Sequence, residues 1–207
     1  MPRSLPPCQR CNRIGLALLA TALVLGACAS SPGPALSWVR LPVEAASASA
    51  PAAARVQGVW QLMTPVLLPG HLDRDVLFVP QGAAGLQPLG GARWAEPLRD
   101  AVPRLLRQDL ARELGVPVWV APLPPGVSPT RQLRVEFGAF DVAADGRSVE
   151  LRARWSLADP KGAAPPAVFD AAFESAATGA SANELAAAHR QALAELARRI
   201  ADSAAGR

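Results

Sequence analysis

Residues 149–157 alternate strictly between apolar and polar side chains, and this pattern constrains the fold more than any other. One parity is apolar throughout: Val149, Leu151, Ala153, Trp155 and Leu157. A period of two is typical of a strand with one buried face. The similar segment 133–142 precedes it, and Ala-Asp-Gly-Arg at 144–147 predicts a hairpin turn between them. Because the apolar parity of 133–142 changes after Phe137, we expect a β-bulge near Gly138.

Two longer segments have the apolar spacing of amphipathic helices. In 95–114 the apolar residues recur at steps of three and four: Leu98, Val102, Leu105, Leu106, Leu110 and Leu114. Gly115 suits the position just past the end, while Pro103 should kink the helix or delay its start. The second helix is predicted to begin at Ser181, which has capping-box spacing with Glu184. Its apolar stripe consists of Leu185, His189, Leu193, Leu196 and Ile200.

Shorter apolar runs predict the remaining strands, at 37–41, 56–68, 76–79, 86–89, 118–120 and 168–175. Pro65 interrupts the second of these runs, so the chain there should be an edge or a strand end. The Ala/Ser/Pro-rich segment 43–55 is expected to be a flexible loop, and 72–75 a polar turn. Together these elements predict an α+β fold, a mostly antiparallel β-sheet with two amphipathic helices packed on one face.

The first 27 residues are organised like a lipoprotein signal peptide. Three arginines within residues 1–13 precede the apolar stretch 14–25, which is too short to span a bilayer. The following Leu-Gly-Ala-Cys at 25–28 resembles the lipobox of bacterial lipoproteins. We therefore expect cleavage before Cys28 and lipidation of its thiol, with an ordinary secretory signal as the alternative. The predicted parts are a signal peptide (1–27), a tether (28–35) and one domain (36–207).

The residues after the cleavage site bear on the location of the protein. Ala29 and Ser30 follow Cys28, so the aspartate that usually retains lipoproteins at the inner membrane is absent. The expected location is the periplasmic face of the outer membrane, with the lipid as the membrane anchor. Cys8 and Cys11 form a C-x-x-C, but they lie in the leader and lack further metal ligands. No metal and no cofactor other than the lipid on Cys28 is expected.

The formal charge of +4 suggests a nucleic-acid partner, but the leader accounts for most of it. Removing Arg3, Arg10 and Arg13 leaves 18 basic and 17 acidic residues, with no basic cluster. Because a phosphate-binding surface needs clustered positive charge, no nucleic-acid partner is expected.

The titratable residues do not form a recognisable catalytic pattern. His189 lies on an apolar stripe, which indicates a buried structural histidine, and His71 lies in a turn that should be exposed. Asp73 and Asp75 flank Arg74, which favours a salt-bridged or capping turn over a catalytic carboxylate pair. The motifs of serine hydrolases, zinc proteases and P-loop proteins are missing from the sequence. We therefore predict that the protein is not an enzyme, and a hydrolase is the least favoured hypothesis.

Three features together resemble the PqiC/YmbA family of ABC-type transport auxiliary lipoproteins. A lipobox is followed by a short strand at 37–41. The run Leu-Pro-Gly-His-Leu-Asp-Arg-Asp at 68–75 is similar to the family's Leu-Pro-x-x-Leu-Asp-Arg run, and Arg-Trp-Ala-Glu-Pro-Leu at 93–98 is similar to the segment that enters its first helix. Two features depart from the family, since the first strand lacks tyrosine and Pro80 stands where an arginine is frequent.

The resemblance implies a non-enzymatic accessory role beside MCE-domain proteins, which form lipid conduits across the periplasm, and associated transporter components. Leu72, Asp73, Arg74 and Trp94 are the candidate partner-binding residues. Their alternative role is structural, with Asp73 capping a turn, Arg74 pairing with it and Trp94 packing under the helix. Two other functions remain open, an assembly lipoprotein of the outer membrane and a lipid-binding shuttle. A homo-oligomer is possible.

Overall fold

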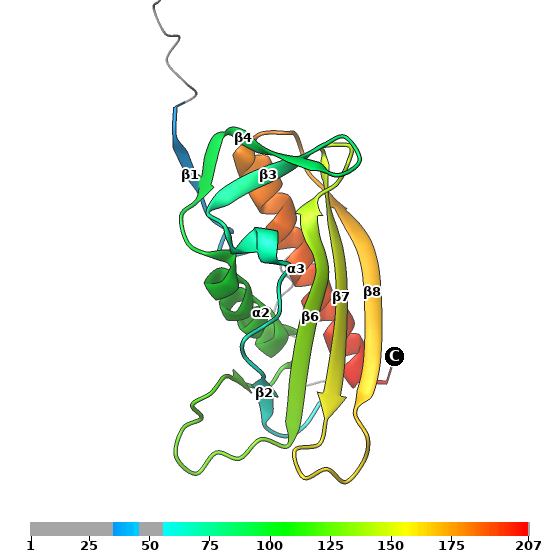
Figure 1. Cartoon of the computed structure of the whole chain (residues 1–207). Coiled ribbons are helices and arrows are strands. Elements are labelled where there is room, and N and C mark those ends of the chain that lie inside the picture. The colour runs from blue at the N-terminus through cyan, green and yellow to red at the C-terminus, as the bar shows by residue number, and fades with distance from the viewer. Residues whose placement is uncertain (1–34, 46–55, 207) are drawn as a thin grey trace, which may run out of the picture. The chain divides into compact units, whose positions relative to one another are not determined.

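The predicted α+β class is confirmed by the computed structural model, which describes residues 35–45 and 56–206 (Figure 1). The described helices and strands all belong to one compact unit, Leu36–Arg207. The signal peptide, Cys28 and most of the predicted loop 43–55 lie outside the described residues, so these expectations remain predictions.

The larger sheet is built around three long antiparallel strands, β6, β7 and β8 (Figure 1). Its short strand β2 is parallel to both of its neighbours, β5 and β6. The strands are, in spatial order, β5 (Val118–Trp119), β2 (Trp60–Leu62), β6 (Arg131–Val142), β7 (Ser148–Ala158) and β8 (Ala167–Ala176).

The predicted hairpin between β6 and β7 is confirmed together with its bulge. Phe137 pairs with Ala153, the register then shifts, and Ala139 pairs with Arg152. Gly138 is the extra residue, and its insertion lets both Phe137 and Phe140 turn toward the core. The apolar parity of β7 is buried as expected, with Leu157 only partly so.

A second, three-stranded sheet is a difference from the single sheet that the pattern predicted. Its order is β1 (Ser37–Val39), β4 (Gly85–Trp94) and β3 (Val76–Gln81), with β1 parallel to β4. The runs at 76–79 and 86–89 therefore belong to longer strands than expected. β3 and β4 lie at the opposite end of the unit from β2 (Figure 1).

The predicted strand 56–68 is much shorter in the structure, where β2 covers only Trp60–Leu62. Gly58 has a positive φ of 93°, which strand backbone does not adopt, and Pro65 has no N–H to donate. Beyond Pro65 the pairing resumes only as an isolated bridge between Leu67 and Glu136. The expected turn that follows contains a 3₁₀ helix, η1 (Gly70–Asp73).

Both predicted helices are present. α2 (Leu98–Leu114) begins three residues later than expected, because the N–H of Ala95 donates to the carbonyl of Val39 and continues the β1–β4 pairing. Pro103 lies inside α2. The carbonyl that it leaves without a donor belongs to the exposed Arg99, so water can bind there. Gly115 ends the helix with φ of 72°.

α3 (Ala182–Ala204) starts with the predicted capping box, in which Ser181 and Glu184 bind each other's backbone N–H groups. α3 lies across β7 and β8, and α2 packs beside it, so that the helices cover one face of the larger sheet (Figure 1).

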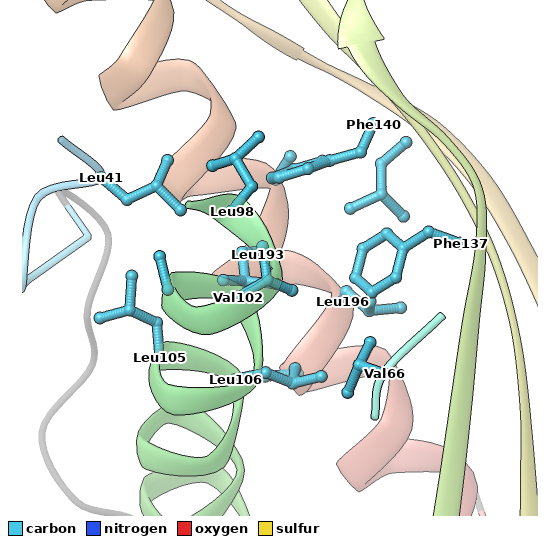
Figure 2. Packing of buried hydrophobic residues seen from close by; sticks show 14 of the residues in the cluster. Leu41, Val66, Leu98, Val102, Leu105, Leu106, Phe137, Phe140, Leu193 and Leu196 are labelled. Atoms are coloured by element: carbon cyan, nitrogen blue, oxygen red, sulfur yellow. The ribbon is translucent and has the colours of Figure 1, made fainter. Parts of the chain in front are cut away.

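The core forms where the helices meet that sheet. Figure 2 shows side chains from α2, α3 and β6 converging, among them Val102, Leu193, Leu196, Phe137 and Phe140. Burial of this apolar surface is the main favourable contribution to folding. Among the helices of the described residues, none is long and apolar enough to cross a membrane.

Candidate functional site

The Leu-Asp-Arg run lies on η1 and the residue after it, beside the start of α2. The side chain of Leu72 is 8% exposed and belongs to the core, and its N–H donates to the carbonyl of Pro69. Leu72 thus anchors the turn rather than presenting a surface to a partner.

The sequence suggested that Asp73 pairs with Arg74, but in the structure Asp73 pairs with Arg99. Its carboxylate accepts a 2.5 Å hydrogen bond from Arg99 of α2, and both side chains are more than half exposed. Arg74 is exposed, and no interaction joins it to another residue in the described part of the chain. The structural role expected for Arg74, pairing with Asp73, was therefore wrong, and its charge faces solvent beside the Asp73–Arg99 pair.

Trp94 ends β4 and is almost fully buried, at 3% exposed. Its indole meets the ring of His189 edge to face, with the ring centroids 5.5 Å apart. Its backbone N–H donates to the carbonyl of Asp75, 2.5 Å away. Trp94 therefore connects the turn after η1 with α3, and the ring contact is with α3 rather than with α2, the helix that this segment enters.

His189 is buried on α3, as its position in the apolar stripe indicated. Its Nδ1–H donates to the carbonyl of Leu185 at 2.8 Å, and the rings of Trp94 and Phe140 meet it edge on. Burial lowers the pKa of His189, because the apolar surroundings disfavour the imidazolium. The charge of nearby Asp141 acts in the opposite direction but is the smaller effect.

His71 contacts a residue of β6, although the sequence indicated an exposed position in a turn. Its Nε2 is 2.5 Å from a carboxylate oxygen of Asp141 on β6, and its side chain is 36% exposed. The two residues are 70 positions apart, so no local pattern could have predicted the contact. No group of three or more histidine, cysteine or acidic residues within the described ranges could hold a metal ion.

The structure also contains a buried ion pair that the sequence interpretation missed. Arg190 of α3 and Asp109 of α2 are 1% and 2% exposed and bind each other directly. Arg112 adds a bond of 3.3 Å to Asp109 and one of 3.1 Å to Glu44. A signal existed, because Asp109 follows Leu105 and Leu106 by four and three residues, which places a carboxylate on the apolar stripe.

The sequence matches the family described as ABC-type transport auxiliary lipoprotein component over residues 40–201. The match covers nearly the whole compact unit and includes η1, Trp94, α2, most of α3 and the buried ion pair. No functionally curated protein matches the sequence.

Two crystal structures have the same fold. One, of an uncharacterized protein, is 19% identical and has a TM-score of 0.63, with 82% of this chain and 98% of the other covered. The second, a Xanthomonas campestris protein of family DUF330, is 17% identical with a TM-score of 0.63 and coverages of 82% and 96%. At these identities the likeness shows the fold alone.

Proposed function

The chain belongs to the family of ABC-type transport auxiliary lipoprotein components, and we propose that it is the outer-membrane accessory lipoprotein of an MCE-type lipid transport system. The lipid on Cys28 holds it at the periplasmic face of the outer membrane. The folded unit docks an MCE-domain protein, which conducts the lipid, and does no chemistry itself. The family match over residues 40–201 is the observation that carries this proposal.

The contacts of the titratable groups support a docking role over a catalytic one. His189 is buried against Leu185, His71 contacts Asp141, and Asp109 is held by Arg190. Each of these groups therefore already has a partner within the fold. A general base needs access to a substrate proton, and buried His189 lacks it.

Within the Leu-Asp-Arg run, Arg74 is the residue that contacts the partner protein in this proposal. Its guanidinium is exposed beside the turn that Leu72 anchors and Asp73 ties to α2. An exposed guanidinium on an anchored turn favours a carboxylate on the docking protein, because arginine binds carboxylates with two parallel hydrogen bonds.

The lipid anchor is tested by replacing its thiol. Cys28→Ser should lose the acyl label in cells fed a labelled fatty acid and leave the membrane fraction. The matched control is Cys8→Ser/Cys11→Ser, which removes the two other cysteines of the chain and should keep both properties. An acyl label that persists in Cys28→Ser would contradict the anchor.

The partner is tested by photo-cross-linking in intact cells. A photoreactive amino acid replaces Arg74 on the turn or, as the control, Lys161 in the exposed loop between β7 and β8. An MCE-domain protein should be captured from position 74 and not from 161. Capture of an outer-membrane β-barrel protein from position 74 instead would support the assembly-lipoprotein alternative and overturn this one.

A further inference from the structure

The three-stranded sheet has one face in the core, and its opposite face is partly exposed, with Val76, Phe78 and Pro80 only half-buried. Inward-facing side chains such as Val39, Leu77 and Trp94 are buried. The opposite face is also apolar, and we name it the outer sheet face. It consists of Leu36, which directly precedes β1, and Trp38 of β1, together with Val76, Phe78 and Pro80 of β3 and Leu86, Pro88 and Arg93 of β4.

The strand register places these residues on one side of the sheet. Trp38 and Val76 both pair with Arg93, so the three lie in one row across β1, β4 and β3. Cross-strand partners project from the same face, and successive residues alternate between faces. Because Leu77 is buried, its neighbours Val76 and Phe78 must point outward.

The outer sheet face continues along the β3–β4 hairpin beyond a register shift between Val76 and Phe78. Phe78 pairs with Pro88, and Pro80 pairs with Leu86, so two further rows carry apolar side chains outward. Leu36 directly precedes β1, two residues before Trp38, and the alternation of extended chain puts it on the same side.

The exposure and charge of this face are unusual for a surface in water. Leu36 and Trp38 are 57% and 58% exposed, and Leu86 is 44% exposed. No charged residue occurs between Val76 and Ala92 in the sequence, so Arg93 is the one charged residue that β3 and β4 contribute to the face, and the exposed Arg40 directly follows β1. Single exposed apolar side chains are ordinary, but adjoining ones on one sheet face indicate a binding surface.

We propose that the outer sheet face rests on the phospholipid surface of the membrane that carries the anchor. This inference depends on the proposed lipidation of Cys28. Leu36, a member of the face, follows Cys28 by only eight residues. Such a segment spans at most about 28 Å when fully extended, so the lipid keeps the face within reach of the headgroups.

The chemistry of the face fits a lipid surface. Tryptophan is enriched where hydrocarbon meets water, because its ring is apolar and its N–H is polar. The long apolar side chains around Trp38 can enter the headgroup layer without burying a charge. Arg93 is 28% exposed and donates a hydrogen bond to the carbonyl of Ala92, and its ion pair with Asp75 is long at 3.8 Å, so its guanidinium can turn to a lipid phosphate. Docking by this face would give the unit one fixed orientation on the bilayer.

The experiment uses the acylated mature protein in vesicles of phosphatidylethanolamine and phosphatidylglycerol. After cleavage and acylation no native thiol remains free, so an introduced cysteine can carry an environment-sensitive fluorophore. Leu86→Cys places it on the outer sheet face. Val168→Cys is the matched control, because Val168 is an equally apolar residue, 58% exposed, on β8 of the other sheet. Pro88→Cys replaces Leu86→Cys if that variant does not fold.

Brominated acyl chains should quench the fluorophore at position 86 and leave the one at 168 unchanged. An acylated protein with no quenching at 86 would overturn the proposal. A blue shift at 86 without bromolipid quenching would show that a second copy or another protein covers the face, and this also overturns it. Mass spectrometry of the mature chain reports the anchor separately, and a chain without acyl groups would remove both the anchor and this inference.

Discussion

The guanidinium of Arg190 donates hydrogen bonds of 2.6 and 2.7 Å to the two carboxylate oxygens of Asp109, and water reaches neither side chain. The same guanidinium donates to the carbonyl oxygens of Pro42 and Val43. A single buried side chain therefore joins α3 to α2 and to the segment that follows β1.

Removing one member of this pair should strongly destabilise the fold. Asp109→Ala leaves Arg190 charged and buried, which costs about 3–5 kcal/mol. For a domain of this size the melting temperature should fall by roughly 10 °C, measured by circular dichroism. Asp73→Ala, which breaks the exposed pair with Arg99, is the control and should cost less than about 1 kcal/mol. Equal losses in the two variants would contradict the assigned role of the buried pair.

Protonation of His189 should make the fold less stable in mild acid. Because burial lowers its folded-state pKa below the ordinary value of 6.5, the unfolded chain takes up the proton first as pH falls. Stability is then fully present above about pH 6.5 and is lost below it, by at most about 1.4 kcal/mol per pH unit. Urea unfolding of the wild type and of His189→Gln on either side of that pH measures the effect.

The His189→Gln variant should lose this part of the pH dependence, whereas His71→Gln should keep it. Asp141 is the charged residue that acts on His189, and it is retained in both variants. An unchanged pH profile in His189→Gln would assign the dependence to another group.

Gly58 should not tolerate a side chain. Its φ of 93° is unfavourable for any other residue, and a Cβ atom would collide with Oγ1 of Thr130. That hydroxyl binds the N–H and carbonyl of Val59, next to β2. Gly58→Ala should therefore cost more than the roughly 1–2 kcal/mol of the left-handed backbone alone. Gly126→Ala is the control, because Gly126 has a similar φ of 78° but open space around it; chemical denaturation that gave equal losses would exclude the clash.

Alanine substitutions at Leu72 and Arg74 should affect different properties, the first the stability of the fold and the second the binding of the partner. Leu72→Ala removes a buried side chain from the core and should cost about 2 kcal/mol or more. Arg74→Ala changes an exposed side chain and should alter stability by no more than about 0.5 kcal/mol, measured by thermal melting. Recovery of the partner by affinity purification should nevertheless fall in Arg74→Ala. Undiminished recovery would place the docking contact elsewhere.

The sequence was most informative where neighbouring residues decide the structure. The β6–β7 hairpin, its bulge at Gly138 and the capping box at Ser181 follow from periodicity and short spacings. The burial of His189 was also predictable, because it belongs to the apolar stripe of a helix. Of the candidate partner-binding residues, Leu72 and Trp94 are buried and Arg74 is exposed, and Asp73 pairs with Arg99 rather than with its neighbour Arg74.

The start of α2 shows why element ends were harder to predict. The helical pattern extends to Ala95, but the N–H of Ala95 is bound by Val39 of a strand more than fifty residues earlier. The carbonyl of Val39 therefore keeps Ala95 in the sheet. The local sequence pattern around Ala95 contains no information about this contact.

The amino-acid sequence alone determined the class of fold, the two helices and the long hairpin, because their hydrogen bonds and apolar faces repeat over a few residues. Tertiary structure alone decided that the strands divide into two sheets, that His71 meets Asp141 and that Arg190 meets Asp109, 81 positions away. The packing of whole helices and strands decides which oppositely charged side chains meet, and the local sequence around each residue does not. The outer sheet face arises in the same way, since the pairing of β1 with β4 brings Trp38 beside the largely apolar β3–β4 hairpin.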